Sequence, residues 1–360
     1  MTEPRRAQRS RSIPVAVLGA TGAVGQTFVR LLDDHPSFDL VAVAASERSV
    51  GKRYGDAVHW LEGDLAPRIA AMPVLPCSPQ MVEASLVFSA LDSTVAGTIE
   101  QSFAQAGRFV LSNARNHRMD DDVPLVIPEV NPEHVGLLAL QRERRGWPGA
   151  IVTNANCASI VITLALAPLH QAFGITRLFV TTLQAASGAG YPGVPSLDLL
   201  GNVIPFIGGE EETKIETETL KMLGRYTVDG VVPAKFPISA QVNRVPVEHG
   251  HTACMAVEFE RRVAPQQASD ALRAWKSAIA TLQLPSAPAQ PIIVTEEPAR
   301  PQPRRDVHAG GGMTVTVGRI RGDPILDVRL VASGHNTIRG AAGASILNGE
   351  MLVARGLIEP

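Results

Sequence analysis

Cysteine is scarce in this chain, with three in 360 residues. Three scattered thiols cannot form the disulfide framework that is typical of small secreted proteins, so we expect reduced cysteines and a cytoplasmic location. Long hydrophobic runs are missing as well. None reaches the roughly 18 residues that a transmembrane helix requires, so we expect no membrane span.

The chain also lacks an excess of charge of either sign. Its 33 Lys and Arg against 35 Asp and Glu give a formal net charge of −2 at pH 7. No basic stripe is present to neutralise a phosphate backbone, so we expect no nucleic-acid partner. Residues 1–12 hold four arginines but no apolar core of the signal-peptide type, and we interpret them as a disordered leader.

The chain does contain enough apolar sequence for two domains. Its hydrophobic fraction is 45%, and single cores rarely grow beyond about 250–300 residues. In the first half, buried-strand segments alternate with helical segments, which predicts an α/β fold with a parallel sheet covered on both faces. The predicted strands are residues 14–18, 39–45, 85–91 and 108–114, and the predicted helices are 26–35 and 94–107.

The pattern changes after about residue 150. The strand segments become longer and partly alternate between apolar and polar residues, which predicts an α+β domain with a one-sided sheet. These segments are 176–184, 252–260, 313–320 and 325–333. Residues 285–303 contain six prolines and are expected to form an exposed connector. The helical segment 336–358 can pack back onto the first domain.

A glycine-rich turn stands between the first predicted strand and its helix. In GATGAVG, Gly19, Gly22 and Gly25 are spaced three apart, a variant of the dinucleotide-binding fingerprint. Glycine lets backbone N–H groups approach a pyrophosphate, and the helix N-terminus adds a favourable dipole. The strand before and the helix after favour this interpretation over an ordinary tight turn.

The end of the second predicted strand indicates which dinucleotide binds. NAD sites usually hold the ribose hydroxyls with an acidic residue roughly 20 positions after the glycines. This chain instead has SERSVGK, where Arg48 and Lys52 bring positive charge to a 2′-phosphate. Ser46 and Ser49 add hydrogen-bond donors, whereas Glu47 could hold the ribose of NAD. We expect NADP(H).

Cys157 stands at a strand-to-helix junction in the segment TNANCAS. Asn154 or Asn156 can cap the helix, and the partial positive charge at a helix N-terminus lowers a thiol pKa and favours the thiolate. We therefore interpret Cys157 as a nucleophile. Cys254 lies inside an apolar strand and Cys77 has no recognisable charged context, so both fit the alternative of an inert, packed cysteine.

Seven segments together resemble the aspartate-semialdehyde dehydrogenases typical of archaea and fungi, in that family's order and over about residues 13–357. They are GATGAVG, SNARNHRM, VIPEVNPEH, TNANCAS, TTLQAASGAGYPGVPSLDLLGNVIPFIGGEEETK, NRVPVEHGHT and NTIRGAAGASILN. The resemblance implies a Rossmann-type NADP-binding domain joined to a catalytic and dimerisation domain like that of glyceraldehyde-phosphate dehydrogenase. We assign residues 13–155 and 337–360 to the first domain and 156–336 to the second, and expect a homodimer or a dimer of dimers.

The implied reaction is the reversible, NADPH-dependent reduction of L-4-aspartyl phosphate to L-aspartate 4-semialdehyde, in the route to lysine, threonine and methionine. Cys157 would displace phosphate and form a thioester, which splits one difficult step into two. The resemblance makes His251 the acid/base residue, with an ordinary pKa that suits the task. On spacing alone, His249 is an almost equal candidate.

The resemblance also implies substrate contacts. Arg244 would hold the α-carboxylate through two parallel hydrogen bonds. Glu211 would take the ammonium group and Lys214 the phosphate. Because GGEEETK is one residue longer than the related segments, Glu210 stays open as the alternative glutamate.

Arg118 occupies the position of a phosphate-binding arginine, and Arg115 is its competitor. Asn113 can contact the same phosphate, and Gln184 would orient the substrate near the thiol. Without the resemblance, Gln184 would be an ordinary polar strand residue.

Further cofactor contacts are implied around the nicotinamide. Ser187 and Gly188 belong to SGAG, whose backbone can come close to the ring. Asn336 would bind the carboxamide. The remaining expected contacts are Thr21, Ala23 and Val24 in the glycine turn and Ser89 in a later strand.

Other functions compete with this one. A malonyl-CoA reductase or another acyl-thioester reductase would keep the cysteine, but Arg244, Lys214 and Arg118 favour a small amino-dicarboxylate with a phosphate. An N-acetylglutamyl-phosphate reductase is a more distant relative. A non-catalytic NADP-binding sensor is disfavoured because Cys157 and His251 are intact. No motif predicts a metal site.

Overall fold

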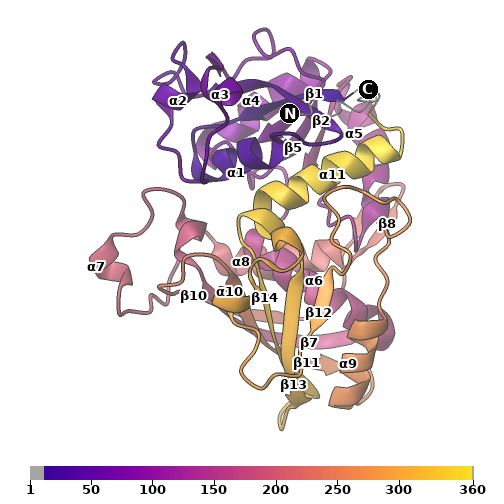
Figure 1. Cartoon of the computed structure of the whole chain (residues 1–360). Helices are drawn as coiled ribbons and strands as arrows, with labels where there is room; N and C mark the ends of the chain where they lie inside the picture. The colour runs from indigo at the N-terminus through magenta and orange to yellow at the C-terminus, as the bar shows by residue number, and fades with distance from the viewer. Residues whose placement is uncertain (1–11, 359–360) are drawn as a thin grey trace, which may run out of the picture.

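The computed structural model describes residues 12–358. Two six-stranded sheets organise the chain, and the last long helix, α11 (Gly343–Ala354), crosses between the parts that carry them (Figure 1). The expected leader, residues 1–12, lies outside the described residues except for its last position.

The first sheet is parallel throughout, with the order β3-β2-β1-β4-β5-β6. The strand order reverses between β1 and β4, and open α/β sheets bind ligands at the carboxyl ends of the strands at such a switch point. The strands are β1 (Ile13–Leu18), β2 (Phe38–Ala45), β3 (Val74–Pro76), β4 (Leu86–Ser89), β5 (Phe109–Ser112) and β6 (Ala150–Thr153).

Helices cover both faces of this sheet, as the alternating pattern predicted. One buried cluster joins Phe28 of α1 and Leu347 of α11 to one face, and a second cluster joins Phe103 of α4 to the other. The helices of this part are α1 (Ala23–Leu32), α2 (Tyr54–Ala57), α3 (Pro67–Ala70), α4 (Ser93–Gln105), α5 (Leu137–Arg145) and the 3₁₀ turn η1 (Pro132–Gly136).

The second sheet is mixed, with the order β10-β7-β11-β14-β13-β12. One face packs on α6, α8 and α9 in a third buried cluster. On the other face Phe179 is 48% exposed and Cys254 is exposed, so this sheet is one-sided, as predicted. Its elements are β7 (Ile175–Gln184), β10 (Ile238–Arg244), β11 (His251–Phe259), β12 (Ile292–Val294), β13 (Val315–Gly322), β14 (Val328–Gly334), α6 (Cys157–Phe173), α8 (Glu211–Met222) and α9 (Pro265–Ala274).

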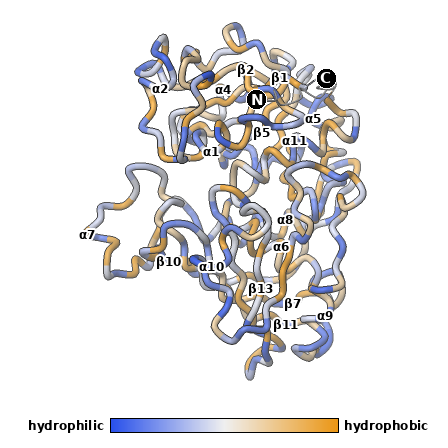
Figure 2. The backbone as a smooth tube through the Cα atoms, viewed as in Figure 1, coloured by the Kyte–Doolittle hydropathy of each residue, from blue (hydrophilic) through white to orange (hydrophobic). Residues whose placement is uncertain are grey.

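A long excursion between β7 and α8 carries apolar side chains outward. Leu197 is 90% exposed and Phe206 is 76% exposed, and the hydropathy colouring shows apolar stretches along this excursion (Figure 2). The remaining elements are η2 (Ala186–Ala189), α7 (Ser196–Leu199), β8 (Arg225–Thr227), β9 (Gly230–Val232), α10 (Pro303–Asp306), η3 (Ala309–Gly312) and the π-helix η4 (Ile338–Ala342).

The proline-rich segment 285–303 is more than the expected connector. Its central residues form β12, which pairs in parallel with β13 at the edge of the second sheet. An edge strand tolerates prolines nearby because its outward N–H groups need no partner. Strand periodicity also does not identify β3, β6 and β10, two of which have only three or four residues.

A buried ion pair holds the start of the last helix. Arg339 in η4 is completely buried and donates to the Glu129 carboxylate at 2.6 and 2.8 Å. Glu129 lies before η1, so the pair ties η4 to a segment far away in the sequence. Two parallel charge-assisted hydrogen bonds fix the relative orientation of both segments.

Replacing Arg339 with Met would leave the Glu129 carboxylate buried and unpaired, which costs about 3–5 kcal/mol. We expect a clearly lower thermal unfolding midpoint by circular dichroism. Arg273→Met is the matched control because the Arg273–Glu296 pair is exposed, and such pairs contribute at most about 1 kcal/mol. Equal midpoints for the two variants would contradict the structural role of Arg339.

Candidate active site

Cys157 is the first residue of α6, which follows β6 after three residues. Asn156 caps this helix, since its Oδ1 accepts from the backbone N–H groups of Ala158 and Ser159 at 2.9 and 3.1 Å. Asn154, the other candidate cap, is buried and hydrogen-bonds elsewhere. The cap holds the thiol at the N-terminus of a helix.

Three neighbouring strands of the second sheet bring Gln184, Arg244 and His251 to one edge. β7 and β10 run parallel and end at Gln184 and Arg244, which are partners in register. β11 runs antiparallel to β7 and begins at His251. Because two parallel strands end where their antiparallel neighbour begins, the three side chains gather beside Cys157.

The thiol and the His251 ring are in contact. Cys157 Sγ lies 3.0 Å from His251 Nε2, and His251 Nδ1 accepts a hydrogen bond from the Ala185 backbone N–H at 3.1 Å. Since Nδ1 is an acceptor, the neutral ring carries its proton on Nε2, facing the sulfur. His249 instead lies in the turn before β11 and stacks on His335 at 4.9 Å, so it does not compete for the thiol.

Burial controls the protonation of this pair. Burial and the Glu211 carboxylate raise the pKa of the Cys157 thiol to about 12, against the lowering effect of Arg118 and Arg244. Burial, followed by the charge of Arg244, lowers the pKa of His251 to about 3. A neutral thiol therefore faces a neutral imidazole. The raised thiol pKa opposes the prediction that the helix N-terminus favours the thiolate, and burial is its largest cause.

Glu211 opens α8 and points toward the thiol. Its Oε1 accepts from Asn156 Nδ2 at 2.8 Å and from Gln184 Nε2 at 3.2 Å. Lys214, one turn later, lies 3.2 Å from Oε2. Glu210 has a left-handed backbone (φ 60°) and a side chain that is 70% exposed. The structure therefore places Glu211, and not Glu210, beside Cys157.

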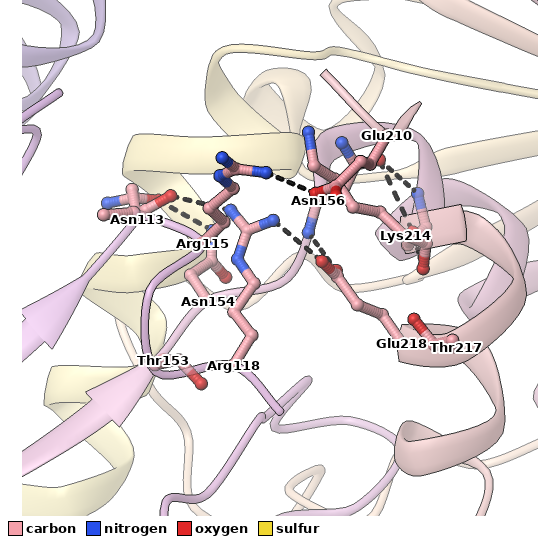
Figure 3. A network of polar contacts seen from close by, with 12 residues as sticks. Asn113, Arg115, Arg118, Thr153, Asn154, Asn156, Glu210, Lys214, Thr217 and Glu218 are labelled. Carbon is pink, nitrogen blue, oxygen red and sulfur yellow. Dashed lines mark hydrogen bonds and ion pairs between the residues drawn. The ribbon is translucent and has the colours of Figure 1, made fainter. Parts of the chain in front are cut away.

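The two competing arginines have different surroundings (Figure 3). Arg115 is exposed and forms an ion pair with Glu210 at 2.5 Å. Arg118 is only 7% exposed and lines the same cavity as Asn113 and Cys157. Arg118 is therefore the arginine that faces the thiol.

One cavity of about 420 Å³ runs from the glycine turn to the thiol. It lies at the carboxyl ends of β1 and β4, where the strand order reverses, as expected for a nucleotide site. The expected site residues in its lining are Gly22, Ala23, Val24, Asn113, Arg118, Cys157, Ser187, Gly188 and Asn336.

The glycine turn fits a dinucleotide phosphate. A Cβ on Gly19, which has a φ of +74°, would lie 2.6 Å from the Ala90 carbonyl oxygen, and a Cβ on Gly25 would lie 2.2 Å from the Gly19 oxygen. The Tyr54 hydroxyl donates to the Ala20 carbonyl at 2.7 Å and holds the turn in place. Compact backbone next to the start of α1 leaves N–H groups available to an anion.

The other residues expected to contact the cofactor differ in exposure, and they are not part of the cavity lining. Ser46 and Arg48 are exposed and Ser49 is half-buried, all directly after β2. Thr21 lies in the glycine turn, where its carbonyl accepts from a glutamine side chain at 3.1 Å. Ser89 is completely buried at the end of β4 and does not line the cavity. The three residues that follow it do so instead.

Ser187, Gly188 and Asn336 line the same cavity as the glycine turn and the thiol. Asn336 Nδ2 donates to Ser187 Oγ at 2.8 Å. A Cβ on Gly188 would lie 2.8 Å from Arg244 Nη1 and 3.0 Å from His251 Cε1. Only glycine fits here without displacing the two side chains.

The sequence did not predict two residues of the site, Glu218 and Gly340. Glu218 is buried and binds both Arg118 and the backbone N–H of Asn156 (Figure 3). Its spacing of four from Lys214 on one helix face was the available signal. A Cβ on Gly340 would lie 2.6 Å from the Cys157 Cβ, and the run of small residues after Asn336 was its only signal.

Within residues 12–358, no three His, Cys, Asp or Glu side chains are grouped so that they could ligate a metal ion. In the same residues, every helix is too short or too polar to span a bilayer.

Two family models match the chain. Residues 14–138 match the NAD binding domain of semialdehyde dehydrogenases, and residues 166–339 match their dimerisation domain. The first match covers β1 to β5 of the parallel sheet, and the second covers all strands of the mixed sheet.

Curated relatives and solved structures agree with these matches. An aspartate-semialdehyde dehydrogenase of Archaeoglobus fulgidus is 51% identical over 96% of this chain and 99% of its own length. The Saccharomyces cerevisiae enzyme of the same name is 46% identical over 95% of this chain and 98% of its own. The structure of aspartate semialdehyde dehydrogenase with NADP from Candida albicans superposes with a TM-score of 0.88 at 43% identity, covering 96% of this chain and 100% of that one.

The charges around Cys157 predict opposite changes in thiol reactivity. Glu211→Gln removes the carboxylate that raises the thiol pKa, so alkylation by iodoacetamide at pH 8 should become faster. Arg244→Met removes a cation that lowers this pKa, so alkylation should become slower. Below the pKa, each change of about 1 in its value alters the thiolate fraction about tenfold. Cys157→Ser gives the background rate of alkylation at the other cysteines. If both Glu211→Gln and Arg244→Met changed the alkylation rate of Cys157 in the same direction, this electrostatic explanation would be refuted.

Proposed function

The chain belongs to the aspartate-semialdehyde dehydrogenase family, and from this premise we propose that it catalyses the NADPH-dependent reductive dephosphorylation of L-4-aspartyl phosphate to L-aspartate 4-semialdehyde. One observation carries the proposal: a single cavity joins a glycine turn that fits a dinucleotide to a cysteine in contact with a histidine. The family resemblance and the charges around the thiol support the choice of substrate.

In the proposed first step, Cys157 Sγ attacks the acyl carbon, the bond to the phosphate oxygen breaks, and the thiol proton passes to the released phosphate, leaving a thioester. Bound NADPH would supply the hydride that converts this acyl group to the aldehyde. The thiolate then leaves as the aldehyde is released, and it takes up one proton from water, which is the proton consumed overall. Covalent catalysis of this kind replaces one high barrier with two lower ones.

His251 would act through its Nε2–H group. That donor faces Cys157 Sγ at 3.0 Å because the Ala185 N–H occupies Nδ1. It can therefore stabilise the thiolate as nucleophile and leaving group, and the negative oxygen that develops beside the sulfur. In this role the ring donates a hydrogen bond at one atom, and the acid/base role that the resemblance implies stays a prediction.

We propose that Arg244 and Glu211 bind the two charged groups at the amino-acid end of the substrate. Arg244 is buried and uses one Nη1–H for the Ala185 carbonyl at 2.7 Å, so other N–H groups are available for the α-carboxylate. Glu211 lies between Asn156 and Gln184 and would take the ammonium group. Gln184 would orient the acyl group.

Arg118 and Lys214 would bind the phosphate, with Asn113 beside them. Arg118 Nε has no hydrogen-bond partner among residues 12–358 although it is buried. A buried unpaired donor is costly, so an anionic oxygen is the partner that this guanidinium lacks. The same cavity contains Cys157, which supports a phosphate position next to the acyl carbon that would be attacked.

The proposal extends to the domain boundaries, the oligomeric state and the cellular compartment. Residues 13–155 and 337–360 would form the NADP-binding domain, and residues 156–336 the catalytic and dimerisation domain. The open face of the mixed sheet is a surface for a second copy of the chain, which supports a homodimer or a dimer of dimers. Cys77, Cys157 and Cys254 are all free, which fits a reducing compartment such as the cytoplasm.

Turnover tests the proposed reaction in its reverse direction. With L-aspartate semialdehyde, NADP and phosphate, the purified protein should form NADPH, and omission of phosphate should stop the reaction. Cys157→Ser should lower kcat by a factor on the order of 10³ or more, because the nucleophile is lost. Absence of turnover together with NADPH oxidation by malonyl-CoA would instead identify a thioester reductase.

Cofactor preference tests the residues after β2. Arg48→Ala should raise the KM for NADP by roughly tenfold or more, since hydrogen bonds to charged groups contribute about 1.5–3 kcal/mol. The KM for NAD should change little because NAD lacks the 2′-phosphate. Arg68→Ala is the control, as Arg68 is exposed and pairs with Asp33 on the surface. Equal losses with NAD and NADP would exclude a 2′-phosphate contact of Arg48.

A further inference from the structure

Helix α8 carries four ionisable side chains on one face. They are Glu211, Lys214, Glu218 and Lys221, whose spacings of three, four and three residues keep them in line. The first two belong to the substrate site described above. Glu218 and Lys221 are 1% and 4% exposed, and charged side chains are rarely buried so deeply unless they are paired.

Glu218 links two parts of the site that are far apart in the sequence (Figure 3). Its Oε1 accepts from Arg118 Nη1 at 2.9 Å, and its Oε2 accepts from the backbone N–H of Asn156 at 2.6 Å. Arg118 follows β5, whereas Asn156 is the residue before Cys157. One carboxylate therefore contacts both the arginine proposed to bind phosphate and the backbone next to the nucleophile.

Lys221, one turn later, fixes the segment that carries Arg118. Its ammonium group donates to the carbonyl oxygens of Arg118, Asp120 and Val123 at 2.8, 2.8 and 3.0 Å. The three donors of the ammonium group are all used. The loop after β5 is therefore held against α8 through its backbone, and Glu218 orients the side chain.

This arrangement limits how Arg118 can meet a ligand. Nη1 is held by Glu218, and Nη2 donates to the Asn113 carbonyl at 2.7 Å. Nε has no partner in the described part of the chain. The guanidinium is thus oriented before any anion arrives, which reduces the entropy lost on binding.

We propose that Glu218, supported by Lys221, is a positioning residue that sets Arg118 and Cys157 at a fixed separation, so that a phosphate bound to Arg118 lies next to the sulfur. Glu218 does not touch the substrate in this proposal and acts through Arg118 and Asn156. The proposal rests on the proposed function for the identity of the anion.

Glu218→Gln tests the proposal with a side chain of the same shape. Its amide has one acceptor oxygen, and its NH₂ group would meet one of the two N–H donors, so both contacts cannot be kept. We expect the KM for phosphate to rise roughly tenfold or more, because a charge-assisted hydrogen bond is lost. The KM for the semialdehyde should change much less. Glu216→Gln is the matched control, since Glu216 lies on the same helix and accepts from the Ala240 N–H at 3.1 Å.

A double-mutant cycle separates positioning from a structural role. If Glu218 acts through Arg118, then Glu218→Gln should raise the KM for phosphate much less in an Arg118→Gln background than in the parent protein. Additive effects would overturn the proposal. A lower unfolding midpoint with an unchanged KM for phosphate would also overturn it. Should Glu218→Gln not fold, Glu218→Asp keeps the charge and should raise the same KM by a smaller factor, and an unchanged KM would again overturn the proposal.

Protection of Cys157 from alkylation can be measured without turnover, so it tests the role of Glu218 separately from the proposed function. Inorganic phosphate bound at Arg118 should slow alkylation of Cys157 by iodoacetamide, and Glu218→Gln should raise the phosphate concentration needed for half-protection. Protection in the parent protein without any turnover would reject the proposed function and leave the role of Glu218 standing. Equal half-protection in the parent protein and Glu218→Gln would reject the role of Glu218.

Discussion

The capped N-terminus of α6 is the feature on which the rest of the site depends. The chain passes there from the last strand of the parallel sheet into the central helix under the mixed sheet. Asn156 uses all of its polar side-chain atoms and its backbone N–H, with Glu211 and Glu218 as partners on α8. Because Cys157 is the next residue, the contacts that fix the position of Asn156 also restrict the backbone that carries the sulfur.

Burial fixes the positions of the site residues, but it disfavours the charged forms of the Cys157 thiol and the His251 ring. Desolvation raises the pKa of the Cys157 thiol and lowers the pKa of His251. Glu211, which is suited to bind an ammonium group, adds to the first effect, while Arg118 and Arg244 oppose it. The pKa of the sulfur is therefore set first by burial and then by the balance of three nearby charges.

The proposed mechanism depends on a single backbone group. The Ala185 N–H points at Nδ1 of His251 and leaves the proton on Nε2, toward the sulfur. Gly188 lets this part of the chain come close to Arg244 and His251, since a Cβ there would collide with both. The loop after β7 thus fixes the tautomer of the histidine and forms the wall of the cofactor cavity.

Much of this protein could be predicted from local sequence. Strand and helix periodicity, the glycine turn and a cysteine at a strand-to-helix junction are short-range patterns, and they predicted the parallel sheet, the one-sided sheet and the dinucleotide site. Short strands such as β6 and β12 were not predicted, because three or four residues show too little periodicity to be recognised. The order of the motifs along the chain indicated the family.

Local spacing did not decide between neighbouring candidates, and the tertiary structure gives the physical reason why one of each pair faces the thiol. His251 faces the thiol because β11 begins there, while His249 lies in the turn before it. Glu211 and Glu210 differ by one residue, yet the left-handed backbone at Glu210 turns that side chain outward. Glu218 gained its partners from segments about 60 and 100 residues away. Such choices depend on side-chain direction and on long-range packing, and local spacing determines neither.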